Sequence, residues 1–381
     1  MREHTPKDVT VMLTGGHVTP AIATIEEIQS RYPSWRLVFV GRKHAFEGVS
    51  VVSEEYTLIT SMGIRFLPII AGRLKREGGI GQMFALFKTP IGYIQAFFYM
   101  IRERPSVVVS FGGYVGLPVS LVAWAFGIPV VIHEQTTRPG VANRMIARIA
   151  KEICVSFPDT SLYFRSSRIH VTGLPIRRGI LKFPQKSPIQ LPKDDRPILL
   201  IVGGSTGSVS INSIVYKALP KLLRRFIVIH QVGRISETRA HEVARSLPPD
   251  VRRFYIPEAY IAGDFYSWAI HNAKIVICRS GANTVMELGV AASVALCVPL
   301  PWSANQEQYH NAKYLEQGGG VVLPQHEATA GKLLELVQTM MATWDERKAK
   351  AQTLAARIPK DGARRFVDVI GQVVAMKSSR V

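Results

Sequence analysis

The stretch VMLTGGHVTPAIA at residues 11–23 contains the order of elements that decides the fold. An apolar run predicts a buried strand, two glycines follow it, and a helix is expected to begin near His17. Adjacent glycines let a backbone approach another group closely, and the amides that open a helix attract negative charge. The stretch therefore predicts a strand–turn–helix unit that binds an anion. An ordinary turn capped by His17 is the alternative.

The same order of elements returns further along the chain. PILLIVGGSTGSVSINSIVYKAL (197–219) repeats strand, glycine turn and helix. SFGGYVGLPVSLVAWAFGIPVVIHEQ (110–135) and CRSGANTVMELGVAASVALCVPLPWSANQ (278–306) share a longer order of glycine turn, helix, strand and polar residues. Continuous apolar strands that alternate with helices are typical of parallel sheets buried on both faces. We therefore expect two doubly wound α/β domains facing a central cleft, with ligands beyond the carboxyl ends of the strands.

Length and composition suggest where the two domains divide. A chain of 381 residues fits two domains, since a domain takes roughly 100–200 residues. The segment TGLPIRRGILKFPQKSPIQLPKDDRP (172–197) is rich in proline and charge and is predicted to be the linker. We expect an N-terminal domain over 1–176 and a C-terminal domain over 177–354. The pattern of 344–376 predicts helix, and the end of the chain, about 355–381, is expected to pack back on the first domain.

Charge and cysteine usage narrow the class of protein. The net charge of +19 is spread through the chain, which favours a phosphate-rich substrate or an anionic membrane over nucleic acid. Cys154, Cys278 and Cys297 lack metal-ligand spacing, and their odd number argues against a disulfide framework. No apolar run precedes Val9, so no signal peptide is expected. A reducing cytoplasm fits these features.

Two apolar stretches resemble membrane spans without being predicted as such. Residues 107–132 carry no charge, but their four glycines and two prolines predict strand, glycine loop, helix and strand. Residues 80–101 are interrupted by Lys88 and Pro90. We expect interfacial or core helices in these places rather than spans.

The glycine turns belong to a longer set of motifs. TGGHVTPA, FGGYVGLP, GIPVVIHEQ, PGVANRMIARIA, VTGLPIR, VGGSTGS, CRSGANTVMEL and NQEQYHNA occur in this order between about Val9 and about Leu336. In order and spacing the set resembles the MurG family, the lipid-II-forming N-acetylglucosaminyltransferases of peptidoglycan synthesis. The resemblance implies the GT-B fold. It also implies inverting transfer of N-acetylglucosamine from UDP-N-acetylglucosamine to a lipid-linked muramyl-pentapeptide pyrophosphate.

The resemblance also implies a place and partners. The family works peripherally at the cytoplasmic face of the cell membrane, so an anionic inner membrane surface is an expected partner. Other cell-wall synthesis proteins are further candidate partners. The chain has no Asp-x-Asp element, so neither a metal nor another cofactor is expected.

In the first domain, the resemblance assigns the acceptor site. The two glycine turns are implied to hold the acceptor's pyrophosphate. His17 would lie beside the acceptor hydroxyl, where an imidazole that changes charge near neutral pH suits a general base. Glu134 is the rival candidate for that role. Thr136 occupies the place of a typical family asparagine among the substrate-binding residues. The turn residues are Thr14, Gly15, Gly16, Gly112, Gly113 and Tyr114.

In the second domain, the resemblance assigns the donor site. The carboxylate of Glu287 is implied to accept hydrogen bonds from both ribose hydroxyls, and the helix start at 280–282 would face the diphosphate. Gln308, with Asn305 nearby, would read sugar hydroxyls through its amide. The remaining implied contacts are Arg177, Ser205 and Ile256. The whole nucleotide segment is Ala282, Asn283, Thr284, Val285, Met286 and Glu287.

Membrane docking is predicted for residues 66–101. This region combines apolar with basic side chains, a pattern typical of reversible interfacial binding. The apolar residues are Phe66, Leu67, Ile80, Met83, Phe84, Phe87, Phe97, Phe98 and Tyr99, and the basic ones are Arg73, Lys75, Arg76 and Lys88.

Other functions stay open at the level of sequence. A lipid glycosyltransferase with a diacylglycerol acceptor would share the donor half, although TGGH, HEQ and PGVANR together favour the muramyl acceptor. A UDP-N-acetylglucosamine 2-epimerase should offer several carboxylates near the sugar, and the glycine turns here have few. A non-catalytic member of a cell-wall assembly is the third alternative.

Overall fold

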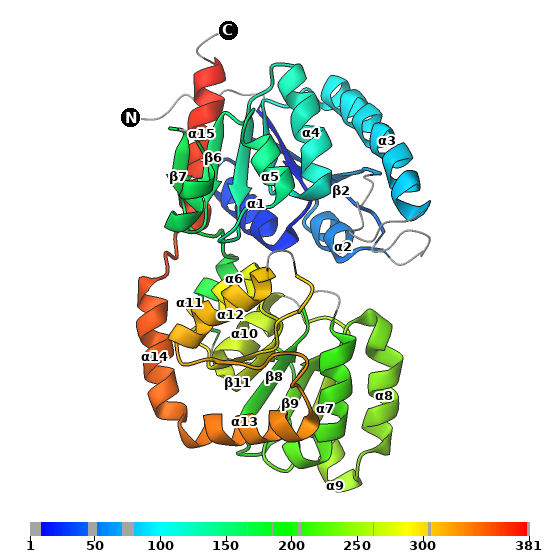
Figure 1. The fold of residues 1–381 in the computed structure, drawn as a ribbon, viewed down its shortest axis with the longest axis vertical. Coiled ribbons are helices and arrows are strands. Elements are labelled where there is room, and N and C mark those ends of the chain that lie inside the picture. The colour runs from blue at the N-terminus through cyan, green and yellow to red at the C-terminus, as the bar shows by residue number, and fades with distance from the viewer. Residues whose placement is uncertain are drawn as a thin grey trace. The chain divides into compact units, whose positions relative to one another are not determined.

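The structure is a computed structural model that describes 9–44, 52–70, 80–165, 167–184, 186–204, 207–261, 263–303 and 306–378, with backbone alone for 80–89 and 378. It divides into two compact units (Figure 1). The first comprises Met1–Arg177 and Asp361–Val381, and the second comprises Arg178–Lys360.

Within its described residues, the first unit contains a parallel sheet of seven strands in the order β3-β2-β1-β4-β5-β6-β7. The central strands β1, β4 and β5 bury side chains on both faces, as a sheet covered by helices requires. The strands are β1 (Thr10–Thr14), β2 (Arg36–Gly41), β3 (Arg65–Pro68), β4 (Val107–Ser110), β5 (Val130–Glu134), β6 (Glu152–Val155) and β7 (Ile169–Val171).

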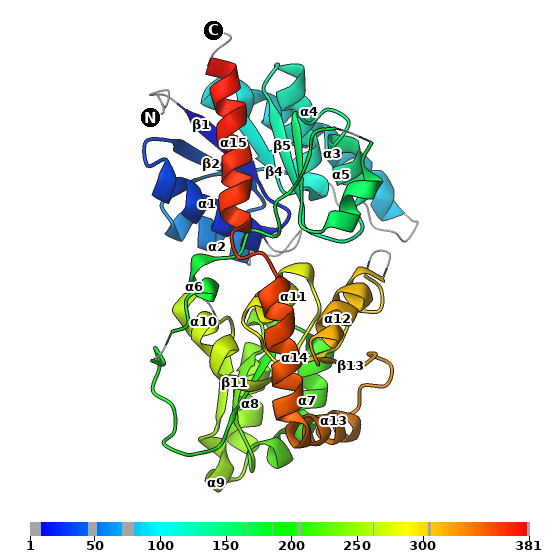
Figure 2. The same cartoon turned by 90° about the vertical axis from the view of Figure 1, so that its left-hand side faces the viewer.

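Helices cover both faces of this sheet. Val11 and Leu13 point to the face that is covered by α1, α2 and the C-terminal α15 (Figure 2). Met12 points to the opposite face, under α3, α4 and α5. The helical segments are α1 (Val18–Arg31), α2 (Glu54–Ser61), α3 (Ile80–Glu103), α4 (Gly113–Ala125), α5 (Val141–Ile146), η1 (Pro158–Tyr163) and α15 (Gly362–Ser378).

The neighbouring strands β1 and β4 form a topological switch point. The chain leaves β1 into α1 on one face and leaves β4 into α4 on the other. Because the two connections diverge, the carboxyl ends of these strands border a crevice in which open α/β sheets bind ligands. Both glycine turns of the first unit lie there.

The second unit repeats this architecture. Its described strands form a parallel sheet in the order β10-β9-β8-β11-β12-β13, with the switch point between β8 and β11. Helices α7 and α13 pack against one face, and α10 packs against β8 and β11. The strands are β8 (Ile198–Val202), β9 (Ile227–Gln231), β10 (Tyr255–Glu258), β11 (Ala273–Cys278), β12 (Ala295–Cys297) and β13 (Val321–Val322).

The helical segments of the second unit complete the list of elements. They are α6 (Arg178–Leu181), α7 (Val209–Leu222), η2 (Arg234–Ser236), α8 (Glu237–Ser246), α9 (Pro249–Arg252), α10 (Gly263–Asn272), α11 (Ala282–Val290), α12 (Glu307–Gln317), α13 (Ala330–Ala342) and α14 (Trp344–Arg357).

The predicted fold class, two doubly wound α/β domains, is confirmed. The division at Arg177/Arg178 falls inside the stretch predicted to be a linker, and α6 belongs to the second unit. The helical stretch 344–376 is two helices, because Ile358 turns extended before Pro359. The cysteines are free and buried.

The two apolar stretches fold as the sequence suggests. Residues 107–132 form β4, α4 and the start of β5. Residues 80–101 lie in α3, which continues through Pro90. Among the residues that the structure describes, no helix is long and apolar enough to cross a membrane.

Candidate active site

The first glycine turn is held by hydrogen bonds within the protein. Thr14 ends β1, and its hydroxyl donates to the Ser110 hydroxyl at the end of β4, 3.3 Å away. The Gly15 amide donates to the carbonyl of Val40 at 2.7 Å, and the Gly16 amide donates to the Glu55 carboxylate. Since both glycine amides are engaged, an anion at this turn would meet the start of α1 instead.

The second glycine turn contacts the first. Gly112 has a φ of +83°, a conformation that residues with a Cβ rarely adopt. Its amide donates to the Ser110 hydroxyl at 3.2 Å. A Cβ on Gly16 would overlap the Gly112 carbonyl, and a Cβ on Gly112 would overlap the Asn143 side chain. Glycine is needed at both positions because three chain segments meet there.

His17 stands where α1 begins, without capping it. No side-chain hydrogen bond caps this helix, so the capping role considered for His17 is wrong. Its Nδ1 lies 3.3 Å from the carbonyl oxygen of Phe111. A carbonyl only accepts hydrogen bonds, so this contact assigns the proton to Nδ1 and leaves the lone pair on Nε2 in the neutral ring.

Glu134 is buried and fully engaged at the end of β5. One carboxylate oxygen accepts from the Thr136 amide at 2.9 Å and from the Thr136 hydroxyl at 2.7 Å. The other accepts from the Asn143 amide nitrogen at 2.7 Å. Thr136 therefore supports Glu134 by its hydroxyl, and Asn143 links Glu134 to the second turn. Asn143 belongs to the PGVANRMIARIA motif, but the motif alone did not indicate this role.

Two further residues lie near the second glycine turn. Tyr114 lies in the first turn of α4, and the Arg42 guanidinium stacks over its ring, 5.1 Å from the centroid. His133 is fully buried, and its Nε2 lies 3.0 Å from the Gly173 carbonyl. Burial lowers the pKa of His133 to about 4. His133 is thus an uncharged structural residue at neutral pH.

In the second unit, the predicted nucleotide segment forms α11. Gly281 is its N-cap residue, with no side-chain cap at the helix start. The Oδ1 atom of Asn283 is buried and has no hydrogen-bond partner among the described residues. Glu287 is buried, with 3% of its surface exposed, rather than a solvated helix carboxylate.

Gln308 lies beside the start of α11. The Ser280 hydroxyl donates to the Gln308 carbonyl at 2.7 Å, and the Asn311 amide donates to the Ser280 carbonyl at 3.1 Å. These bonds join the start of α12 to the start of α11. The preceding Gln306 has a φ of +54°, a strained conformation of the kind that clusters at binding sites.

Arg279 was not singled out from the sequence. Its buried guanidinium follows β11 and donates to the Ser208 and Ser210 hydroxyls at 3.1 and 2.6 Å. It also donates to Gln325 at 2.7 Å and to the Val298 carbonyl at 2.8 Å. Among the described residues, no carboxylate forms an ion pair with it. Arg279 therefore brings a positive charge to the start of α7, at the switch point.

Gln231 is a second residue that sequence reasoning missed. At the end of β9, its side chain donates to the Gly204 carbonyl at 2.7 Å and accepts from the Ile261 amide at 3.0 Å. It thus links the glycine turn after β8 to the segment after β10. A buried amide that holds two loops has no local sequence pattern, so only the fold reveals it.

The other predicted contacts lie as follows. Arg177 is the last residue of the first unit before the chain enters the second. Ile256 lies inside the edge strand β10, opposite Ile229, and its side chain packs against the core. Ser205 and Asn305 lie outside the described residues.

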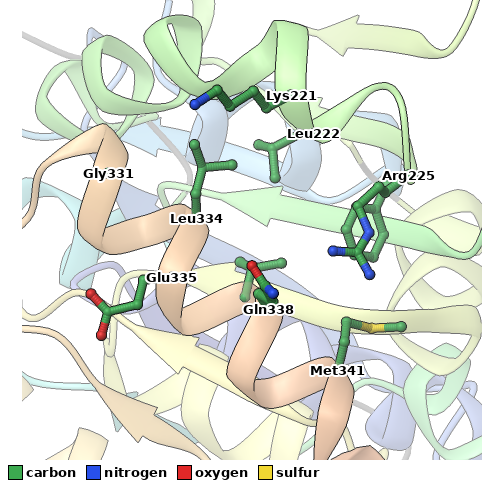
Figure 3. A pocket seen from close by; sticks show the side chains of 10 residues that line it. Lys221, Leu222, Arg225, Gly331, Leu334, Glu335, Gln338 and Met341 are labelled. Atoms are coloured by element: carbon green, nitrogen blue, oxygen red, sulfur yellow. The ribbon is translucent and has the colours of Figure 1, made fainter.

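A pocket in the second unit lies elsewhere. It has a volume of about 340 Å³ and lies between the end of α7 and α13 (Figure 3). Its lining includes Lys221, Arg225 and Glu335. Since α7 ends just before β9 begins, this pocket opens at the amino edge of the sheet, away from the glycine turns. It is not part of the candidate site.

Comparison with known proteins identifies the family. Residues 9–155 match the glycosyltransferase family 28 N-terminal domain, and residues 198–366 match its C-terminal domain. A protein of Anaeromyxobacter sp. (strain K) is 31% identical over 95% of this chain and 91% of its own length. It is named UDP-N-acetylglucosamine--N-acetylmuramyl-(pentapeptide) pyrophosphoryl-undecaprenol N-acetylglucosamine transferase. The chain belongs to the MurG family of glycosyltransferases.

Other relatives agree with this assignment. A Lachnospira eligens protein of the same name is 33% identical over 86% of this chain and 89% of its own length. The crystal structure of Acinetobacter baumannii MurG has a TM-score of 0.65 and 26% identity, covering 96% of this chain and all of that one. A calicheamicin glycosyltransferase, CalG4, shares the fold at a TM-score of 0.67 and 14% identity, over 98% of this chain and 99% of its own.

Proposed function

We propose that this protein transfers N-acetylglucosamine from UDP-N-acetylglucosamine to undecaprenyl-pyrophosphoryl-muramyl-pentapeptide, with inversion, in peptidoglycan synthesis. Membership of the MurG family supports the donor and the acceptor. The observation that carries the proposal is the meeting of both glycine turns with His17 at the switch point of the first unit.

His17 acts as the general base in this proposal. The acceptor hydroxyl attacks C1 of the sugar, the bond from C1 to the phosphate oxygen breaks, and its electron pair leaves with UDP. The hydroxyl proton goes to Nε2 of His17, because Nδ1 already carries a proton toward the Phe111 carbonyl. Glu134 is the weaker candidate, since both of its oxygens accept hydrogen bonds inside the protein.

The second unit holds the nucleotide sugar in this proposal. The start of α11 faces the diphosphate, and Glu287 accepts the ribose hydroxyls. The unpartnered Oδ1 of Asn283 supports a ligand at this helix start. Arg279 adds positive charge beside the start of α7, which favours a leaving group that carries negative charge.

A product analysis tests the proposal. The full-length protein is incubated with UDP-N-acetylglucosamine and the lipid-linked muramyl-pentapeptide pyrophosphate in detergent, and UDP and disaccharide lipid are quantified. Equal amounts of both products are expected. Disaccharide formation on diacylglycerol alone, or conversion of the donor to its 2-epimer, would overturn the proposal in favour of the corresponding alternative. Consumption of UDP-N-acetylglucosamine without formation of the disaccharide lipid would overturn it as well.

We also propose that an apolar face of the first unit docks on the anionic cytoplasmic surface of the membrane. The outer side of α3 exposes Ile94, Phe97 and Phe98, the last with 61% of its surface accessible. Phe97 packs edge to face on Phe126, just after α4, with centroids 5.3 Å apart, so the face continues to the exposed ring of Phe126. Such an exposed apolar surface is typical of interfacial binding.

This face differs in part from the one predicted. Leu67 is buried in the core, and Phe66 packs against a core cluster, so neither faces a membrane. Tyr99 packs on the other cluster, and its hydroxyl donates to the Pro68 carbonyl. The basic residues Arg73, Lys75 and Arg76, and the side chains of 80–89, lie outside the described residues.

A further inference from the structure

A carboxylate lies inside the first glycine turn. Glu55 is the second residue of α2, and its Oε2 accepts from the Arg42 amide at 2.9 Å. The Gly16 amide donates to the same carboxylate. A Cβ on Gly15 or on Gly41 would overlap the Glu55 carboxylate. The first glycine of the turn therefore makes room for Glu55, whose role no local sequence pattern indicates.

The carboxylate of Glu55 interacts with His17. Burial raises the pKa of Glu55, whereas the amides of Arg42 and Gly16 and the charges of Arg42 and His17 act against that rise. An interaction between two charges is mutual. The ionised carboxylate of Glu55 and a positive charge on His17 therefore attract each other.

The other charged groups around the turn have different partners. The Arg42 guanidinium stacks on Tyr114, and His133 is buried and uncharged near neutral pH. The oxygens of Glu134 accept from Thr136 and Asn143. Glu55 is thus the carboxylate that both holds the turn and acts on His17.

We propose that Glu55 is a positioning residue for glycosyl transfer. It fixes the turn that carries His17, and it balances the positive charge that His17 gains when the acceptor proton arrives. This inference rests on the proposed function. In the transfer step, the new glycosidic bond forms as the bond to UDP breaks, and the acceptor proton that moves to Nε2 leaves His17 with the positive charge that Glu55 balances.

The first test replaces the charge and keeps the shape. In Glu55→Gln, kcat is expected to fall by about tenfold or more, with an unchanged KM for UDP-N-acetylglucosamine. The acidic limb of the pH–kcat profile is expected to move to lower pH, because the protonated imidazole has lost its counter-charge. Glu54→Gln, one residue earlier in the same helix turn, is the matched control and should keep the wild-type profile.

A double-mutant cycle separates this role from a purely structural one. In a His17→Ala background, Glu55→Gln should lower kcat by less than twofold, since the group that it assists is gone. Additive losses, or an unmoved pH profile in Glu55→Gln, would overturn the inference. If Glu55→Gln does not fold, Glu55→Asp should keep the wild-type pH profile, and a shifted profile would overturn it. An inactive wild-type protein would instead count against the proposed function.

Discussion

At the scale of single residues, the hydrogen bonds of His17 and Glu134 distinguish the two candidates for the general base. His17→Ala is expected to lower turnover by about 10²–10⁴, the usual contribution of a general base, with donor affinity close to wild type. Glu134→Gln should lower turnover by less than about tenfold, because its oxygens serve Thr136 and Asn143 rather than a substrate. Steady-state kinetics of both variants decide the assignment, and a larger loss in Glu134→Gln would reverse it.

Glu287 carries the prediction for the donor. Glu287→Gln keeps the volume of this buried side chain but removes the charge that would accept ribose hydroxyls. UDP binding should weaken by about 1.5–3 kcal/mol, the range for hydrogen bonds to a charged group. Titration calorimetry measures this loss. Glu316→Gln, on the exposed side of α12, is the control, and equal affinities in all three proteins would refute the ribose contact.

The glycine turns and the start of α11 in the candidate site could be predicted from the sequence because they leave local patterns. Glycines that lack room for a Cβ and polar residues after buried strands leave a local pattern, as at Gly16, Gly112 and the start of α11. Glu55 leaves no such pattern, and although Gln231 ends one buried strand and Arg279 follows another, no local pattern shows which groups they contact. Each acts through a contact far away in sequence, such as Glu55 with Gly16, so its role emerges only when the strands pair.

At the scale of elements, helix α3 shows where sequence reasoning reached its limit. Its apolar residues were predicted, but which of them face the core depends on packing against α4. The expected helix contains Pro90 and continues through it. A proline removes one amide and disfavours the preceding turn, yet tertiary packing offsets that cost.

The exposed face of α3 makes a prediction of its own. Ile94→Ser with Phe98→Ser removes two exposed apolar side chains. Each fully buried side chain contributes about 1.5–3 kcal/mol, so even partial insertion predicts at least about tenfold weaker partitioning onto vesicles. Co-sedimentation with anionic vesicles measures it. Met376→Ser, on the exposed side of α15, is the control. Unchanged binding of the double variant would exclude this face as the dock.

At the scale of the whole molecule, each unit contains a buried histidine that makes the fold less stable at low pH. Burial lowers the pKa of His133 to about 4 and that of His230 to about 3. Below pH 6.5 these histidines bind protons in the unfolded chain but not in the folded chain. The free energy of unfolding therefore decreases as the pH is lowered. Each histidine should lower the free energy of unfolding by about 2 kcal/mol at pH 5 relative to pH 8.

Urea unfolding at both pH values checks this expectation. His230→Gln should reduce the acid-induced loss in the second unit by about 2 kcal/mol, whereas His326→Gln, which alters an exposed ring, should not change it. An equal loss in all three proteins would assign the acid sensitivity to other groups.

The C-terminal helix α15 delays the completion of the first unit during synthesis on the ribosome. Phe366 in α15 packs against His133 and Phe111, and α15 completes one of the two cores around that sheet. The 183 residues of the second unit are synthesised in between, which takes roughly 10 to 40 seconds. During that time the first unit exposes apolar surface. Once Lys360 has been added, the second unit has all of its own residues and can fold before α15 completes the first unit. Order of synthesis and order of completion are thus reversed in this chain.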